Sequence, residues 1–265
     1  MRPVALAGSA VLGLVVLAGL AGMVLPYDVV AAVDPASAGA GPSGAHWMGT
    51  DHLGRDVAWR LALAPRAFVG PGLVAVALAT ALGVAAGALA GFAGGIPAAV
   101  IRYLSTVTAS IPRFVLVLLV VTIYGNEGWL LGAAAGVAWA PAVAEAVHQR
   151  IEALTRAEFV LAARAHGLGP GRILLFHLLW VNCRRMVGRQ AFHLFGYLLV
   201  LETTLSYIGG FGVAEPQPSW GNMLAFEFGQ RTANPWGLWA PVIAIWVTVL
   251  ASTLVGEALA ERNRA

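Results

Sequence analysis

Residues 68–93, FVGPGLVAVALATALGVAAGALAGFA, decide the fold class, because they run for 26 positions (68 through 93) without a charged side chain. A bilayer core about 30 Å thick is crossed by a helix of about 20 apolar residues. This stretch is therefore predicted to be a membrane-spanning helix.

The whole chain shares this apolar character. Of its 265 residues, 59% are hydrophobic and 11% are charged, and the mean hydropathy is +0.78. Soluble domains are about 25% charged, so the apolar excess must face lipid and the chain is predicted to be an integral membrane protein. The single cysteine, Cys183, excludes an intrachain disulfide.

All 16 basic residues are arginine. The absence of lysine excludes a P-loop, whose lysine contacts the nucleotide phosphates, and it also excludes Schiff-base chemistry. If nucleotide drives this protein, another chain must bind it. We therefore expect no cofactor in this chain, and no nucleic-acid partner.

Six segments have about the length of a membrane span, which predicts an all-α protein with six transmembrane helices. The first exceeds the apolar region of a secretory signal and is expected to be an uncleaved anchor. The predicted spans are Val4–Pro26, Phe68–Ala93, Ile101–Tyr124, Trp129–Val147, Arg189–Ile208 and Trp236–Leu259.

The placement of arginine predicts the orientation, since cytoplasmic loops are enriched in positive residues. With the N-terminus inside, the four outside arginines are Arg55, Arg60, Arg66 and Arg231, and Arg113 lies within a span. The inside receives Arg2, Arg102, Arg150, Arg156, Arg164, Arg172, Arg184, Arg185, Arg189, Arg262 and Arg264. Both termini are therefore predicted to be cytoplasmic.

Two loops are then expected outside. In the first, the irregular stretch DPASAGAGPSGAH (residues 34–46) precedes RDVAWRLALAPR (residues 55–66). The second of these stretches is typical of a short amphipathic helix at the membrane interface. The other outside loop, residues 209–235, is rich in Gly, Pro and Trp.

Residues 155–179, TRAEFVLAARAHGLGPGRILLFHLL, form a polar insert that lies on the cytoplasmic side in this orientation. Thr155 and Glu158 fit a capping box, which predicts that a helix begins there. Gly167 suits the end of that helix, and Pro170 suits the first turn of a second one. The insert is therefore predicted to be a helical hairpin.

One face of the first hairpin helix has small side chains at its centre, so a partner could approach it closely. At helical spacing it carries Phe159, Ala162, Ala163 and His166. A docking surface for another protein is one interpretation. A plain amphipathic connector on the inner leaflet is the alternative.

Several blocks, in order along the chain, resemble the inner-membrane permease subunits of ABC importers for dipeptides, oligopeptides and nickel. They include the GTD-x-x-GRD pattern in the first outside loop, the EAA coupling loop of ABC importers, and PSWGNML after the fifth span. The blocks are HWMGTDHLGRDVAWRLALAPR (46–66), GFAGG (91–95), EFVLAARAHG (158–167) with Ile173 and His177, LETTLSYIGGFGVAEPQPSWGNML (201–224), NPWGLWAPVIAIW (234–246) and LVGEAL (254–259).

This resemblance implies a type I importer permease fold in a bacterial inner membrane. Residues 1–66 would form an anchor with an outside loop and interfacial helix, and residues 67–260 would form the permease core. Implied partners are a homologous second permease (a heterodimer), two cytoplasmic ATPases that use ATP and Mg, an extracytoplasmic solute-binding protein and membrane lipid. The implied ATPase-coupling residues are Glu158, Phe159, Ala162, Ala163, Gly167 and Ile173.

The chain also departs from the family pattern. Leu161 replaces a glutamate in the coupling triplet. Trp180 stands where a proline usually follows the family's His-x-Leu block. Glu145 stands where arginine is common, and Ser105 replaces an aspartate. The tail lacks the usual L-R-D-x-L-D-P ending. These departures predict a divergent coupling surface.

Three ionisable residues are candidates for the transport pathway. Arg113 follows Pro112 within the third predicted span, where an arginine costs about 2.5–3.5 kcal/mol on insertion scales. It could meet a substrate carboxylate, or it could snorkel. Glu202 could pair with Arg113, contact solute or, as we favour, hydrogen-bond near the end of the fifth span. His193 shares a helical face with Arg185 and Arg189, a face expected mainly to contact anionic lipid.

His46 and His52 flank Asp51 and invite a metal-site interpretation. They lie on an irregular loop, and the family block already accounts for His46, so no metal site is expected. No catalytic motif is present either. The rival class is a self-contained secondary transporter or channel. Within the family, the solute could be a peptide, nickel or a metal chelate.

Overall fold

The computed structural model describes residues 3–24, 32–230 and 234–261. The described residues form helices α1 (Pro3–Val24), α3 (Val57–Leu63), α4 (Arg66–Ala93), α5 (Gly95–Ser110), α6 (Arg113–Tyr124), α7 (Gly128–Thr155), α8 (Glu158–Ala165), α9 (Pro170–Arg172), the π-helical η2 (Ile173–Cys183), α10 (Arg184–Ile208), α11 (Trp220–Gln230) and α12 (Trp236–Glu261), with a 3₁₀ turn η1 at Pro35–Ser37. The predicted all-α architecture is confirmed for this part of the chain.

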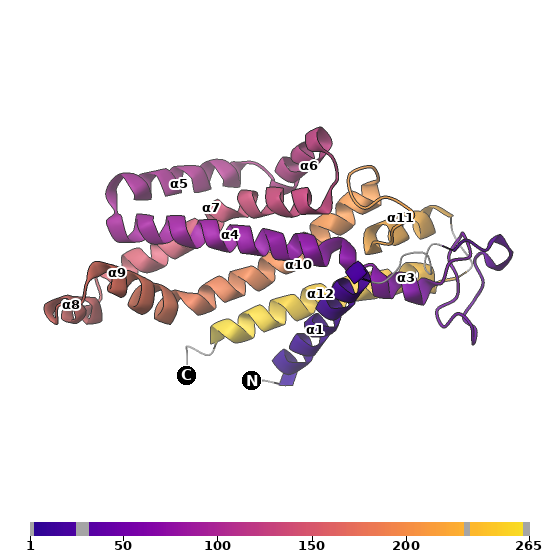
Figure 1. Cartoon of the computed structure of the whole chain (residues 1–265), viewed down its shortest axis with the longest axis horizontal. Coiled ribbons are helices and arrows are strands. Elements are labelled where there is room, and N and C mark those ends of the chain that lie inside the picture. Colours follow the sequence, from indigo (N-terminus) through magenta and orange to yellow (C-terminus); the bar gives the residue numbers. More distant parts are fainter. Residues whose placement is uncertain (1–2, 25–31, 231–233, 262–265) are drawn as a thin grey trace.

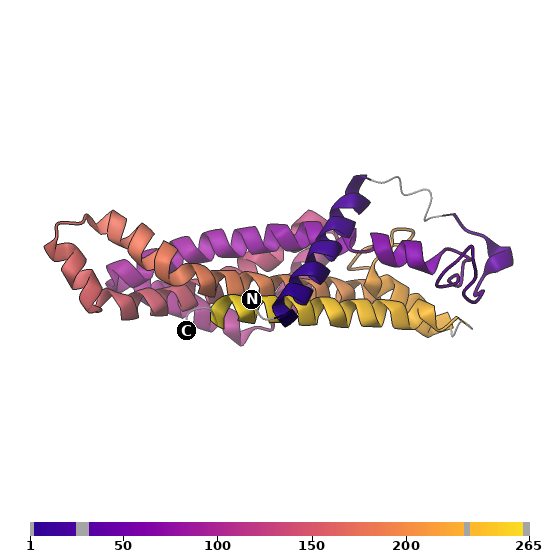
Figure 2. The same ribbon diagram turned by 90° about the horizontal axis from the view of Figure 1, so that it is seen from below.

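The bundle is elongated, and its two ends are built differently (Figures 1 and 2). Helices α8 and α9 lie at one end of the long axis, which we call the hairpin end. Residues 32–56, α3 and α11 gather at the opposite end, which we call the loop end.

Five helical segments within the described residues are long and apolar enough to cross a membrane, and a bent helix pair would make a sixth. The five segments cover the predicted spans other than the third, although Pro26 lies outside the described residues. Two of them begin well before the predicted starts, at Val57 and at Pro170. Arg2, Arg231, Arg262 and Arg264, which entered the predicted orientation, also lie outside them.

The third predicted span, Ile101–Tyr124, is wrong as a single straight helix. The chain forms α5 and α6 instead, bent by 81° at the break. Proline disfavours helical backbone at the residue before it, and Ile111 is accordingly extended, with ψ 127°. Pro112 thus ends one helix and starts the next, and Arg113 becomes the first residue of α6 rather than the middle of a span.

Helices α4 and α7 pack closely because glycines recur every fourth residue on their facing sides. Gly83, Gly87 and Gly91 of α4 face α7, and a Cβ on Gly91 would lie 2.8 Å from the His148 carbonyl oxygen. Gly136 of α7 faces α4 in the same way, since a Cβ on this glycine would lie 2.8 Å from the Leu78 Cβ. Small residues let transmembrane helices approach to backbone contact, so this pair forms the centre of the bundle.

The remaining spans pack around this pair. Helix α10 lies against α4 and α12, and α1 packs on α12 and α4. Ser252 of α12 donates a hydrogen bond to the Phe192 carbonyl of α10 at 3.1 Å. Ser105 of α5 donates to the Pro141 carbonyl of α7 at 2.9 Å, which ties these two helices together.

Candidate functional site

The hairpin end carries the predicted coupling residues, but its first helix does not begin as expected. Thr155 is the last residue of α7, and its hydroxyl donates to the Glu152 carbonyl at 2.7 Å. Helix α8 begins at Glu158, and its N-cap, Ala157, has no side-chain capping bond. The predicted capping box is therefore wrong, because the α7 helix continues through the threonine.

The predicted end of α8 is confirmed. Gly167 has φ +77°, a left-handed conformation that glycine adopts without a side-chain clash. The Leu168 N–H donates to the Ala163 carbonyl at 3.1 Å, which satisfies a terminal helix carbonyl. Pro170 then occupies the first turn of α9, as predicted.

The second half of the hairpin is longer than predicted. Helix α9 continues through the π-helix η2 directly into α10, so residues 170–208 form one helical segment. The predicted boundary between Leu179 and Arg189 is therefore wrong. Wide π turns leave room for side-chain insertion, and the Asn182 amide donates to the His177 carbonyl at 2.6 Å.

Helix α8 is anchored by one side and exposed on the other. Val160 and Ile173 are buried in the main core, with Ala163 packed partly against it. Phe159 and Leu161 are 41% and 56% exposed, and Ala162 is also exposed. We call Phe159, Leu161 and Ala162 the hairpin patch. Its exposed apolar side chains at the tip of the molecule are available to a partner.

A cavity lies beside α7 and α10, with the predicted residue His193 in its lining and Arg113 packed on one of its wall residues. The cavity measures about 350 Å³, and it is lined by Trp139, Ala142, Val143, Gln190, His193, Leu194 and Tyr197. The Arg113 guanidinium lies 4.9 Å from the centre of the Trp139 ring. The rings of Trp139 and Tyr197 are 4.4 Å apart. The structure thus brings Arg113 and His193 to one region.

His193 and Arg189 both contact Glu257 of α12. The distances to its carboxylate oxygens are 3.2 Å from His193 Nε2 and 3.7 Å from Arg189 Nη1. The predicted helical face therefore holds a carboxylate of a neighbouring helix. Contact of this face with lipid stays a prediction.

Glu202 is separate from this cavity. Its side chain is 0% exposed, and it accepts a hydrogen bond of 2.6 Å from the Ser206 hydroxyl. The Val213 N–H in turn donates to Ser206 at 2.9 Å. Within the described residues Glu202 and Arg113 form no ion pair. This packing favours the structural role, in which Glu202 holds the turn that follows α10.

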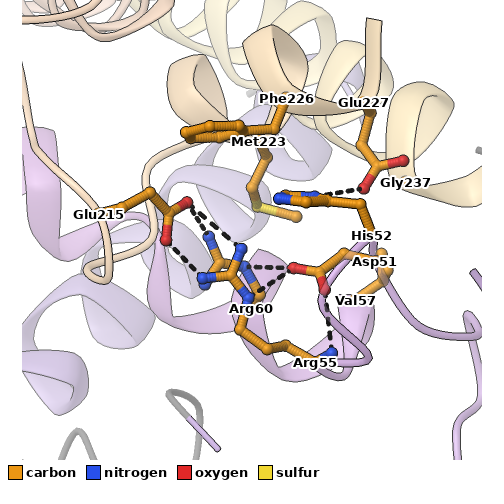
Figure 3. Close-up of a pocket in the computed structure, with 10 residues that line it drawn as sticks. All are labelled: Asp51, His52, Arg55, Val57, Arg60, Glu215, Met223, Phe226, Glu227 and Gly237. Carbon is orange, nitrogen blue, oxygen red and sulfur yellow. Dashed lines mark hydrogen bonds and ion pairs between the residues drawn. The ribbon is translucent and has the colours of Figure 1, made fainter. Parts of the chain in front are cut away.

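The loop end contains a buried ionic cluster that the sequence did not reveal (Figure 3). Arg55 Nε lies 2.7 Å from Asp51, and its Nη1 contacts Glu215. Arg60, 1% exposed, contacts Glu215 at 2.8 Å and Asp51 at 3.5 Å. Burial alone would lower the pKa of Arg55, but hydrogen bonding to Glu215 and the charges of Asp51 and Glu215 more than offset it and raise the pKa. We call these four residues the loop-end cluster.

The two histidines of this loop have different partners. His46 Nδ1 lies 2.8 Å from Asp56, which also caps α3. His52 stacks on Phe226 and lies 3.7 Å from Glu227. No group of three potential metal ligands occurs among the described residues. Both histidines instead tie the first loop to α3 and α11.

Other ties close the loop end. The Asn234 amide donates to the carbonyls of Met48 at 2.8 Å and Thr50 at 3.1 Å. The Trp220 indole donates to the Leu61 carbonyl at 3.1 Å. Segments more than 150 positions apart are thus joined by buried polar contacts. The segment 55–66 does form a short helix, as predicted, but Arg55 and Arg60 face inward.

Comparison with known proteins identifies the family. Residues 83–265 match the model for the binding-protein-dependent transport system inner membrane component. The chain is 30% identical over 253 residues to the glutathione transport system permease protein GsiD of Pectobacterium atrosepticum, covering 96% of this chain and 83% of that protein. It is 28% identical over 229 residues to the dipeptide transport system permease protein DppC of Alkalihalophilus pseudofirmus (86% and 75%).

A third relative is the nickel transport system permease protein NikC of Escherichia coli, 29% identical over 235 residues (89% of this chain and 84% of that protein). The family match, the multi-pass helical fold and these relatives agree with the predicted ABC importer permease in a bacterial inner membrane. The chain belongs to the family of inner-membrane permease components of binding-protein-dependent transport systems.

Proposed function

We propose that this permease forms half of a translocation pathway for short peptides or related small solutes, and that it is driven by ATPases docked at the hairpin end. The hairpin patch is the observation that carries the proposal. Val160 of α8 and Ile173 of η2 are both buried in the main core, so the two halves of the hairpin are tied to the bundle and a push on α8 would be passed to α7 and α10. ATP and Mg would be used by the partner chains, since this chain has no lysine for a P-loop.

The proposed assembly contains a second, homologous permease, two ATPases and a solute-binding protein. Both termini and the hairpin end would be cytoplasmic, and the loop end would face the binding protein. Residues 1–66 would serve as the anchor and outside loop, and residues 67–260 as the core. The names of the three relatives support a peptide or another small solute as the cargo.

Docking of the ATPase can be tested with Ala162→Arg, which places a long cation in the hairpin patch. The control is Ala38→Arg, which alters another exposed alanine, at the loop end. We expect A162R to reduce co-purification of the ATPase at least about tenfold, since a loss of 1.4 kcal/mol of binding free energy is tenfold in affinity, and A38R to leave it unchanged.

The two outcomes that would contradict docking at the hairpin are ATPase retention by A162R and equal losses in both variants. Solute uptake that continues in vesicles without ATP would favour the rival secondary transporter.

A further inference from the structure

The cavity beside α7 and α10 has aromatic walls and polar groups, and a cation, Arg113, packs on one of its wall residues. Trp139 and Tyr197 form part of its wall, and Gln190 and His193 supply polar atoms. Its volume of about 350 Å³ lies in the range of about 300–1,000 Å³ typical of small-molecule sites. The cavity is therefore large enough for a small organic group.

Arg113 provides the positive charge of this region. Its guanidinium packs on Trp139, a wall of the cavity. Its Nε atom is buried and lacks a hydrogen-bond partner, and Arg113 makes no ion pair with any of the residues that the structure describes. Arginine in a membrane normally pairs with an anionic or carbonyl group and marks a substrate or ion pathway. Among the residues that the structure describes, no anionic side chain pairs with the Arg113 guanidinium.

None of the carboxylates discussed next forms an ion pair with Arg113 among the residues that the structure describes. Glu257 contacts His193 from α12 and is also held by Arg189. Glu202 is buried elsewhere and bonded to Ser206. Glu145, on the same helix as Trp139, accepts through one oxygen from the Gln149 amide at 2.8 Å, and its other oxygen is buried without a hydrogen-bond partner. Arg113 therefore remains the cation that an incoming anion would meet.

We propose that Arg113, together with the aromatic pair Trp139 and Tyr197, forms a transient binding site for the carboxylate of the transported solute. The guanidinium would donate to the carboxylate oxygens, a charge-assisted geometry for which arginine is well suited. The aromatic rings would cover the adjacent apolar part of the solute. The proposal rests on the proposed transport function and deepens it by naming the chemical class of the cargo.

The site discriminates among the solutes named for relatives of this chain. A carboxylate-bearing peptide is attracted by Arg113, whereas a free divalent cation is repelled by it. A metal enclosed by carboxylate ligands would present an anionic surface and fit as well. The site thus selects for an anionic group on the cargo and against a bare metal ion.

The test uses the affinity-tagged full chain, with the subunits that co-purify with it, in lipid nanodiscs. The probes are isotope-labelled N-acetyl-Ala-Ala, its neutral C-terminal amide, and Ni²⁺. The variants are Arg113→Gln and Arg113→Lys, and the control is Arg102→Gln, which removes an exposed charge on α5. Equilibrium retention of each probe gives its affinity without any need for ATP hydrolysis.

We expect the wild type to bind the acid about 10–100-fold more tightly than the amide, the range that corresponds to one charge-assisted hydrogen-bonding group. R113Q should lose this preference, R113K should keep part of it, and R102Q should behave as the wild type. Ni²⁺ should bind more weakly to the wild type than to R113Q.

Equal affinities of the wild type for acid and amide would overturn the proposal, as would unchanged acid binding in R113Q or an equal loss in R102Q. The wild-type comparison needs no variant, so a folding defect in R113Q leaves the proposal open to refutation. The Ala162 experiment probes the other end of the protein. A failure of ATPase docking and a failure of carboxylate binding are therefore separate results.

Discussion

The loop end and the hairpin end of this permease differ in how they are stabilised and in what they expose. At the loop end, Arg55 and Arg60 are buried among carboxylates, and contacts join residues 155 or more positions apart. At the hairpin end, the exposed patch on α8 is held by a few buried apolar anchors. The loop end is closed on itself, whereas the hairpin end leaves apolar surface for another protein. The region held by buried ionic contacts and the region available for docking thus lie at opposite ends of the long axis.

The largest contrast is expected between a buried and an exposed arginine. Arg60→Met keeps an apolar stem but leaves Asp51 and Glu215 with one cation fewer. Breaking a buried pair costs about 3–5 kcal/mol, so thermal unfolding in detergent should show a strongly destabilised protein. Arg156→Met at the hairpin end removes an ion pair to Glu152 whose arginine is 80% exposed. It should cost about 0–1 kcal/mol.

Similar shifts in unfolding temperature for Arg60→Met and Arg156→Met would contradict the claim that buried ion pairs stabilise the loop end more than exposed pairs stabilise the hairpin end. In the wild type the raised pKa of Arg55 keeps that arginine charged throughout neutral and moderately alkaline pH. A raised folded-state pKa adds stability that is lost only as the pH rises through it. The contribution of Arg55 should therefore stay constant from about pH 6 to about pH 9.

A second contrast compares two glycines with the same left-handed backbone. Gly49 at the loop end has φ +72°, and a Cβ there would lie 2.5 Å from the Asn234 Nδ2. Gly167 at the hairpin end has φ +77° and open space around it. Gly167→Ala should cost only the backbone strain, about 1–2 kcal/mol. Gly49→Ala should cost about 2–4 kcal/mol, because overpacking is added.

Denaturant titration of both alanine variants measures this difference. G49A should also loosen the start of α12, since Asn234 holds Met48 and Thr50. If G167A were the more destabilised of the two, the hairpin end would be the more tightly packed region, contrary to the contacts described.

The smallest effect on stability is expected at Leu161. Leu161→Glu introduces the glutamate that the family resemblance leads us to expect in the coupling triplet, at a side chain that is mostly exposed. Its unfolding free energy should change by no more than about 0.5 kcal/mol. Its own ATPase should bind about tenfold more weakly, because burial of a leucine contributes about 1.5–3 kcal/mol. Tighter ATPase binding by L161E would show that the patch does not use this leucine.

The sequence predicted the spans well because their apolar length is a local property. Pro112 shows the limit of such local prediction. The sequence shows the proline, but whether the span is slightly kinked or breaks into two helices bent by 81° depends on the packing around it. Thr155 and Glu158 matched a capping pattern, yet α7 extends to the threonine, whose hydroxyl donates to the Glu152 carbonyl within α7 instead of capping α8.

The sites show the same division. Gly167 and Pro170 act locally and were placed correctly. Arg113 was identified as a pathway candidate within the third predicted span, but the aromatic pair Trp139 and Tyr197 beside it lies on other helices and carries no signature in a single sequence. The loop-end cluster was missed for the same reason, since Arg60 and Glu215 meet only after folding.

Hydrogen exchange of the permease in nanodiscs, with and without its ATPase subunits, tests the division of roles most directly. We predict that the ATPase slows exchange in residues 158–172 and leaves residues 46–63 unchanged. Unaltered exchange at the hairpin end, or protection confined to the loop end, would contradict the account.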